Sequence, residues 1–290
     1  MFIGIDHGTT AMRFACELGE FKISREEATS FSFSYLSKLC PISDIKGIAL
    51  SYSMGDNISK ITSIHKVKNR GLVSREGAGK HIGGGTQVFD EVAKSGVPAL
   101  VIPGLHRNSP TDPRFKVYSH QSSPEKIGIA YEICHTLGDN VIISDVSSNT
   151  VTLLVSNGII IGAFDACIFA PGTRHGAIDV NAIRKIDAGG WTANEAFQHA
   201  GVDFSMPAEE RMNTVAMFAA MECAAMLVLN PDAQIALAGT LAPTIANAVE
   251  AHLNRKVAVY DEWCASRGLA RIAQDVFSGT PQILGLGVDL

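Results

Sequence analysis

Residues suited to phosphate chemistry gather near the N-terminus, where a short apolar run ends at Asp6 and a turn of Gly8, Thr9 and Thr10 follows. The Phe and Ile residues before Asp6 favour a strand, so the carboxylate emerges where the chain turns. A carboxylate is a hard oxygen ligand for Mg²⁺, and Gly8 lets the backbone approach phosphate oxygens. The amides and hydroxyls of Thr9 and Thr10 can donate hydrogen bonds to the same oxygens. The segment predicts a hairpin that holds a phosphate and its metal, with an ordinary tight hairpin as the alternative.

Residues 140–164 repeat this pattern in the second half of the chain. An apolar strand ends at Asp145, a turn with Ser147 and Ser148 follows, and two further strand-like runs come after it. A second hairpin of the same design makes coincidence a poor explanation for the first. We therefore predict that Asp145 is a second metal ligand and that both serines contact phosphate.

A third segment, residues 234–241, reads as a buried strand that runs into Gly239 and Thr240 at the start of a helix. A glycine at such a junction can accommodate a nucleotide against bare backbone. Plain packing of a strand against a helix explains the same residues if the segment is taken alone.

The remaining pattern supplies the elements that must position these residues. Apolar periodicity predicts helices over residues 87–94, 124–137, 208–229, 243–253 and 266–277, and strands over 47–51, 97–102 and 257–260. A chain of 290 residues is long for one domain. The break at residues 138–140 divides it into an N-terminal domain, 1–138, and a C-terminal domain, 139–290.

Composition excludes several classes of protein. The chain is 46% hydrophobic and 18% charged, with a net charge of −5. That balance argues against nucleic-acid binding, which would leave a basic face. No apolar run reaches the ~18 residues of a membrane helix and no signal peptide is visible, so we expect a cytoplasmic protein. The six cysteines include no CxxC pair. A metal site or iron–sulfur cluster within one chain is not expected, although a cluster shared across a homodimer stays open.

Together, FIGIDHGTT, VIISDVSSNT and IALAGTLAP resemble, in this order, the superfamily of acetate and sugar kinases, heat-shock protein 70 and actin. The resemblance implies an α/β fold with two ribonuclease H-like domains, each a mixed sheet flanked by helices. It also implies ATP and Mg²⁺ in an interdomain cleft, with the first two segments on the phosphates and the third on the adenosine. More narrowly, the opening MFIGIDHGTTAMRFA looks like the methanogenesis marker protein 12 family of archaeal proteins.

Residues 169–179 are similar to the Gly-Thr-Arg-Ser-Gly-Asp-Ile-Asp segment of acetate kinases. Carried over, Arg174 clamps the transferring phosphoryl group and His175 assists by hydrogen bonding. The alternative is that Arg174 pairs with Asp179 in a surface turn. Acetate kinases have asparagine where this chain has Asp6, so acetate is not supported as the substrate.

Glycine-rich residues 77–87 are not a Walker loop, because Ser74 stands at the required first glycine and His81 follows Lys80. They either present amides to an anionic substrate or form a flexible surface loop.

These features predict an ATP- and Mg²⁺-dependent phosphotransferase that acts on a small acid or hydroxyl compound, in which Asp145 can instead serve as a base. An ATP-driven conformational or activator protein with a protein partner is the alternative, and a nucleotide-binding protein without catalysis is a third.

Overall fold

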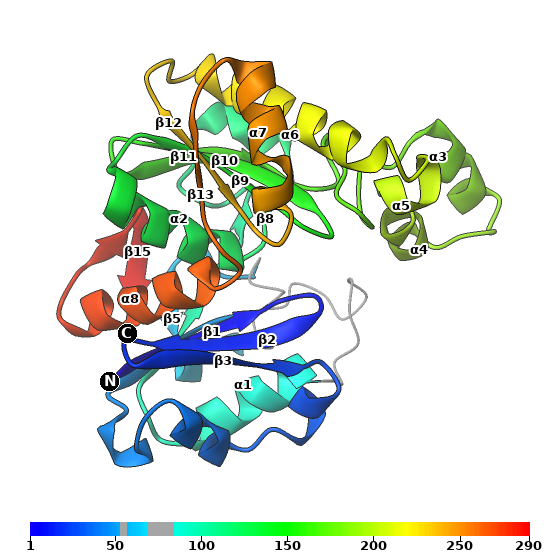
Figure 1. Cartoon of the computed structure of the whole chain (residues 1–290). Coiled ribbons are helices and arrows are strands. Elements are labelled where there is room, and N and C mark those ends of the chain that lie inside the picture. The colour runs from blue at the N-terminus through cyan, green and yellow to red at the C-terminus, as the bar shows by residue number, and fades with distance from the viewer. Residues whose placement is uncertain (53–56, 69–83) are drawn as a thin grey trace. The chain divides into compact units, whose positions relative to one another are not determined.

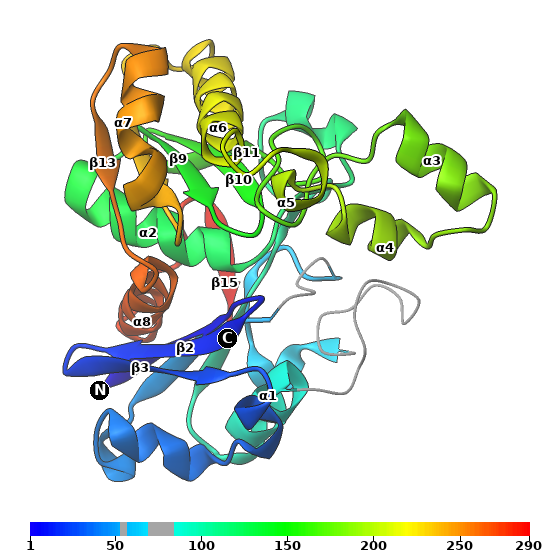
Figure 2. The same ribbon diagram turned by 45° about the vertical axis from the view of Figure 1, so that its right-hand side comes forward.

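A computed structural model describes residues 1–52, 57–68 and 84–290 (Figures 1 and 2). The chain forms two compact units, one of Met1–Thr136 with Trp263–Leu290 and one of Leu137–Glu262. The first change of unit falls close to the predicted boundary at residue 138. The C-terminal segment differs from the prediction, because residues 263–290 belong to the first unit.

The strands are β1 (Phe2–His7), β2 (Ala11–Cys16), β3 (Gly19–Ser24), β4 (Gly47–Ser51), β5 (Ile61–Ser63), β6 (Ala99–Ile102), β7 (Leu105–His106), β8 (His120–Ser122), β9 (Val141–Val146), β10 (Thr150–Ser156), β11 (Ile159–Phe164), β12 (Gln234–Ala238), β13 (Val257–Val259), β14 (Gln282–Ile283) and β15 (Leu286–Asp289). The α-helices are α1 (Gly84–Lys94), α2 (Glu125–Leu137), α3 (Val180–Asp187), α4 (Ala193–Gln198), α5 (Val202–Ser205), α6 (Arg211–Leu227), α7 (Ala242–Leu253) and α8 (Cys264–Phe277). The predicted long helices are confirmed as α1, α2, α6, α7 and α8.

The first unit contains a sheet in the order β14-β15-β5-β6-β4-β1-β2-β3. β1 pairs antiparallel with β2 and parallel with β4. Side chains alternate between the two faces of β1. Ile3 and Ile5 join the apolar cluster that includes Val88 of α1. Gly4 faces α8 instead, where a β carbon would overlap the backbone of Ser266. The close approach of α8 to β1 therefore depends on the absence of a side chain at Gly4.

Packing explains why the C-terminal segment belongs to the first unit. α8 covers β1 and β4, and α2 crosses it where Gly268 meets the backbone of Gly128. After α8, β15 pairs in parallel with β5, with Val288 opposite Ile61. More than 200 residues separate these pairing partners in the sequence, so local patterns give no sign of the contact.

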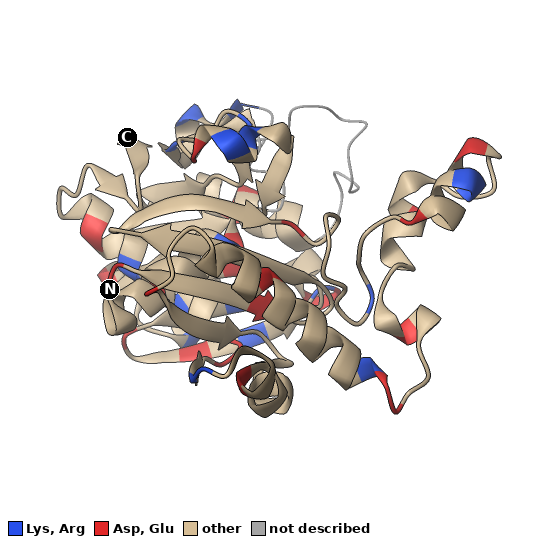
Figure 3. Cartoon of the chain, turned by 90° about the horizontal axis from the view of Figure 1, so that it is seen from above, with Lys and Arg blue, Asp and Glu red and all other residues tan. Residues whose placement is uncertain are grey.

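The second unit contains a sheet in the order β11-β10-β9-β12-β13. α6 packs on β9 and β10 with α7 beside it, around a core that includes Val146, Ala219 and Leu237. The short helices α3, α4 and α5 lie between β11 and α6 in the chain and extend away from this sheet (Figure 2). They carry charges of both signs (Figure 3).

The two units share one strand plan. The order β3-β2-β1-β4-β6 of the first unit matches β11-β10-β9-β12-β13 of the second, with two antiparallel pairs followed by two parallel ones. Asp6 is the fifth residue of β1 and Asp145 is the fifth residue of β9, and both strands have 6 residues. The predicted α/β fold with two mixed sheets flanked by helices is confirmed.

Candidate functional site

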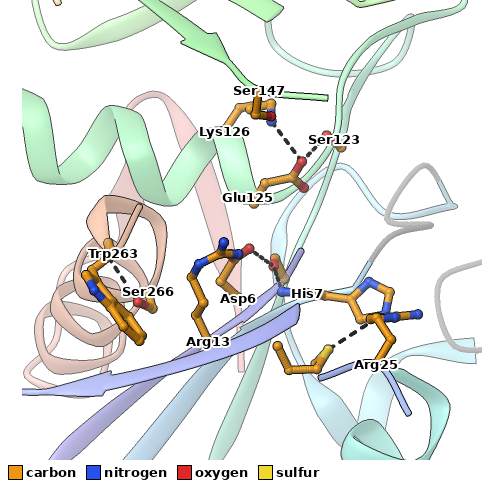
Figure 4. Close-up of polar contacts among 12 residues, drawn as sticks. Asp6, His7, Arg13, Arg25, Ser123, Glu125, Lys126, Ser147, Trp263 and Ser266 are labelled. Carbon is orange, nitrogen blue, oxygen red and sulfur yellow. Dashed lines mark hydrogen bonds and ion pairs between the residues drawn. The ribbon is translucent and has the colours of Figure 1, made fainter. Parts of the chain in front are cut away.

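Asp6 lies at the end of β1 and is buried, with 4% of its surface exposed. The antiparallel register places Arg13 directly across from it on β2. Arg13 Nη1 is 3.6 Å from Asp6 Oδ2 (Figure 4). Ser51 Oγ donates to Asp6 Oδ1 over 3.4 Å. The first hairpin therefore holds a carboxylate and a guanidinium side by side. The positive charge of Arg13 compensates part of the negative charge on Asp6.

The turn after β1 requires its glycine. A β carbon at Gly8 would lie 2.6 Å from Arg13 Nη1 and 2.8 Å from the carbonyl oxygen of Ala11. Thr9 and Thr10 are exposed at the tip. The sequence prediction missed Arg13, although a cation inside the otherwise apolar run of β2 was a visible signal. A guanidinium next to a glycine turn can donate hydrogen bonds to an oxyanion, and the backbone amides of the turn can do the same.

Asp145 lies at the corresponding place in the second unit and is 7% exposed. It neighbours Gly239, which follows β12 with a φ of +92°, a backbone conformation that favours glycine. A β carbon at Gly239 would overlap Asp145 Oδ1 and would lie 2.5 Å from the carbonyl oxygen of Val146. Thr240 follows with its surface exposed. The structure thus brings together the acid of the second predicted segment and the glycine of the third.

The Ser147–Ser148 turn holds the loop that carries Arg174. The amide of Thr173 donates to the carbonyl oxygen of Ser147 over 3.1 Å, and the amides of Arg174 and His175 donate to that of Ser148 over 3.0 and 2.9 Å. These bonds join four predicted site residues of the second unit into one backbone cluster.

The side chains of this loop differ in exposure. Arg174 is exposed and, among the described residues, forms no ion pair with Asp179. The Asp179 carboxylate instead accepts from the Ala182 amide and caps the N-terminus of α3. His175 stacks on Phe197, with 4.7 Å between ring centroids, and its buried Nδ1 has no hydrogen-bond partner in the described part of the chain. Burial, above all, lowers the pKa of His175, so the imidazole is neutral near pH 7. Arg174 is therefore available to a ligand, whereas His175 is held by packing.

A second polar group of the first unit was not predicted. Glu125, at the start of α2, accepts from Ser123 Oγ over 2.5 Å and pairs with Lys126 Nζ at 3.0 Å (Figure 4). Burial opposes ionisation of Glu125, but Lys126 and the Ser123 hydroxyl hold its pKa below the usual range.

His7 is a further buried polar residue of the first unit. Burial, followed by the charge of Arg25, lowers the pKa of His7 to about 4. No local sequence pattern marks Glu125 or His7, because the environment of each depends on neighbours that folding brings together.

Glu222 is a further buried acid, on α6 of the second unit. Its Oε1 accepts from the amide of Ala170 over 3.1 Å. Burial raises the pKa of Glu222 to about 8, so the side chain is mostly protonated at neutral pH. This acid supports the segment that leads into the Arg174 loop.

The donor chemistry of the two aspartates suits Mg²⁺ unequally. No group of three or more His, Cys, Asp or Glu side chains that would hold a metal occurs within residues 1–52, 57–68 and 84–290. Mg²⁺ in nucleotide sites usually takes one or two carboxylates, with waters and phosphates as its other ligands. Asp145, with its oxygen against the bare backbone of Gly239, fits that role. Asp6 fits it less simply because Arg13 lies beside it.

Two further expectations concern other parts of the chain. The glycine-rich segment 77–87 lies outside the described residues up to residue 83, and residues 84–87 form the first turn of α1. In the described parts of the chain, no helix has both the length and the apolar character needed to cross a bilayer.

The fold is shared with known kinases. A propionate kinase from Francisella tularensis superposes with a TM-score of 0.65 at 12% identity, over 94% of this chain and 98% of that one. A ROK family glucokinase from Streptomyces griseus gives a TM-score of 0.55 at 12% identity, over 94% and 99%. At such low identity the likeness establishes the fold alone, and it confirms the expected kinase-like fold.

Sequence comparison gives a closer relationship. No protein-family model matches the chain. A UPF0285 protein from Methanosarcina mazei is 44% identical and one from Methanococcus maripaludis is 40% identical, each over 99% of both chains. The chain belongs to the UPF0285 protein family.

Proposed function

We propose that this UPF0285 protein binds ATP with Mg²⁺ and transfers a phosphoryl group to a small acid or hydroxyl compound. The observation that carries the proposal is the arrangement in the second unit, where Asp145 meets the left-handed Gly239 turn and Ser148 anchors the Arg174 loop. A metal-binding acid, a bare backbone and an exposed guanidinium are the components that phosphoryl transfer needs.

The proposed roles follow from residue chemistry. In the second unit, Asp145 is the Mg²⁺ ligand, Ser147 and Ser148 are the phosphate contacts, and Gly239 and Thr240 are the adenosine contacts. In the first unit, Asp6 is the Mg²⁺ ligand, and Thr9 and Thr10 are the phosphate contacts. Bound Mg²⁺ supplies charge neutralisation for the phosphates. Arg174 stabilises charge on the transferred group through its planar fork of N–H donors, and neutral His175 orients that loop.

The comparisons support a kinase-like role without identifying the acceptor. The Streptomyces griseus glucokinase is described in complex with glucose and AMPPNP, and the other solved structure is a propionate kinase. The relatives come from methanogens, which supports the proposed link to methanogenesis and the proposed assignment to the methanogenesis marker protein 12 family.

Isothermal titration calorimetry with ATP, with and without Mg²⁺, tests the nucleotide site. Asp145→Asn is expected to weaken Mg²⁺-dependent ATP binding at least tenfold, about 1.4 kcal/mol. Asp232→Asn removes an exposed acid of the same unit and serves as the control. Unchanged Mg²⁺-ATP affinity in Asp145→Asn would exclude Asp145 as a metal ligand.

The alternative, an ATP-driven protein that acts on a protein partner, is favoured by one feature. Val180 and Ile183 on α3 and Phe204 on α5 are 61%, 49% and 50% exposed. Exposed apolar side chains on a small helical segment are suited to contact another protein. ADP release measured with small metabolites and with methanogen protein fractions separates the two functions. Stimulation by a small metabolite supports the kinase, and stimulation by a protein supports the alternative.

A further inference from the structure

The side chain of His7 presents buried polar atoms that the proposed nucleotide site does not use. His7 follows Asp6 on β1 and lies on the opposite face of the sheet, toward α1. Its ring lies beside that of Tyr52, with 5.5 Å between centroids. Both ring nitrogens are buried, and neither has a hydrogen-bond partner among residues 1–52, 57–68 and 84–290. A buried polar group that makes no hydrogen bond destabilises the folded state, so a bound ligand would explain its presence.

Arg25 brings a positive charge to the same place. Its side chain lies beside the His7 ring (Figure 4) and is partly buried. Arg25 Nη1 contacts Met12 Sδ at 3.3 Å, and within the described ranges the guanidinium forms no ion pair with a carboxylate. A thioether is a weak acceptor, so the described residues leave most of the hydrogen-bonding capacity of this guanidinium unused.

The start of α1 completes the surroundings. Gly85 lies against His7 Nε2, so closely that a β carbon at this position would overlap the ring. One residue further on, Thr86 Oγ1 is 3.0 Å from the hydroxyl of Tyr52. The first turn of α1, which has 11 residues, therefore faces the histidine and contributes the positive end of a helix dipole.

We infer that His7 and Arg25, together with the Tyr52 and Thr86 hydroxyls, bind an oxyanion of the phosphoryl acceptor, either a carboxylate or a phosphoryl group. Arg25 offers a planar fork that matches either group, and an imidazole N–H donates one further hydrogen bond. The charge of Glu125 acts on His7, but Lys126 pairs with Glu125 and compensates that charge. Glu125 therefore does not take the place of the bound anion.

The inference rests on the proposed function only in treating the anion as the acceptor; binding itself is independent of ATP. The nucleotide-free protein is titrated with acetate, inorganic phosphate and neutral acetamide while ring ¹H–¹⁵N signals are recorded. His7→Asn identifies the signals of His7. Acetate or phosphate is expected to shift them, whereas acetamide is not.

Arg25→Gln is expected to weaken binding of the active anion at least tenfold. Lys94→Gln, which removes an exposed cation from the last turn of the same helix α1, is expected to leave it unchanged. Arg25→Lys keeps the charge but loses the fork, so an intermediate affinity is expected; it replaces Arg25→Gln if that variant fails to fold.

Stronger binding of acetate assigns a carboxylate acceptor, and stronger binding of phosphate assigns an acceptor that already carries a phosphoryl group. No shift of the His7 signals by either anion, an equal shift by acetamide, or wild-type affinity in the Arg25 variants would overturn the inference. Anion binding that persists in a protein unable to bind ATP would refute the proposed function and leave this site standing.

Discussion

Gly239→Ala is expected to destabilise the second unit by about 2–5 kcal/mol. Two terms make up this figure. A left-handed backbone costs a residue with a β carbon about 1–2 kcal/mol, and Gly239 has a φ of +92°. Forcing the new methyl group against Asp145 Oδ1 and the Val146 carbonyl adds about 1–3 kcal/mol of overpacking.

Gly138→Ala is the matched control. Gly138 also belongs to the second unit and has a φ of +95°, but a β carbon there would have no heavy atom within 4 Å. It carries the backbone cost alone, about 1–2 kcal/mol. The difference between the two variants therefore isolates the contact with Asp145 and Val146.

Chemical denaturation gives the free energy of unfolding of each variant, and calorimetry gives its affinity for Mg²⁺-ATP. We expect Gly239→Ala to be less stable than Gly138→Ala by about 1–3 kcal/mol and to lose ATP affinity, because Asp145 must move. Equal stabilities would refute the contact. Unchanged ATP affinity in Gly239→Ala would refute the place of Gly239 at the nucleotide.

The other predictions concern charged residues. Asp6→Asn is expected to cost about 1–3 kcal/mol of stability, measured by denaturation, because the buried Arg13 loses an ionised partner; wild-type stability would show the pair to be unimportant. Arg174→Ala is expected to keep ATP affinity and stability, within about 0.5 kcal/mol, while ATP turnover falls; equal turnover would place this exposed side chain outside the chemistry. Since burial raises the pKa of Glu222 from 4.5 to about 8, its protonated form favours the folded state, and that stabilisation is lost as pH rises through 8. Relative to Glu222→Gln, the wild type should lose up to about 1.4 kcal/mol per pH unit between pH 5 and 8; a constant difference across this range would contradict the assignment.

Local sequence patterns predicted a large part of the fold. Apolar runs followed by small polar turns predicted two hairpins, whose first strands carry Asp6 and Asp145 near their ends. Both hairpins are present. The shared strand plan of the two units agrees with that repeat. Hairpins are predictable because their pairing partners are near in sequence and their turns demand particular residues.

The C-terminal segment shows where such patterns fail. The helix over residues 266–277 was predicted, and its apolar spacing is real. Its membership of the first unit depends on Gly4 and Gly128, which leave room for α8, and on pairing of β15 with β5. These contacts join residues that are far apart in the chain, and a sequence pattern records only that an apolar face exists, not what it covers.

By itself the sequence determined where the candidate chemistry lies: an acid at the end of the first strand in each half, a glycine after β12 and an arginine loop after β11. Only the tertiary structure decided which neighbours surround these groups. It placed Arg13 beside Asp6 and Gly239 beside Asp145. It also brought together two sets that the sequence did not indicate: Arg25 with the buried ring of His7, and the Ala170 amide with the buried Glu222. The reason is physical: strand and turn preferences act over a few residues, whereas burial and charge pairing depend on segments that only folding brings together.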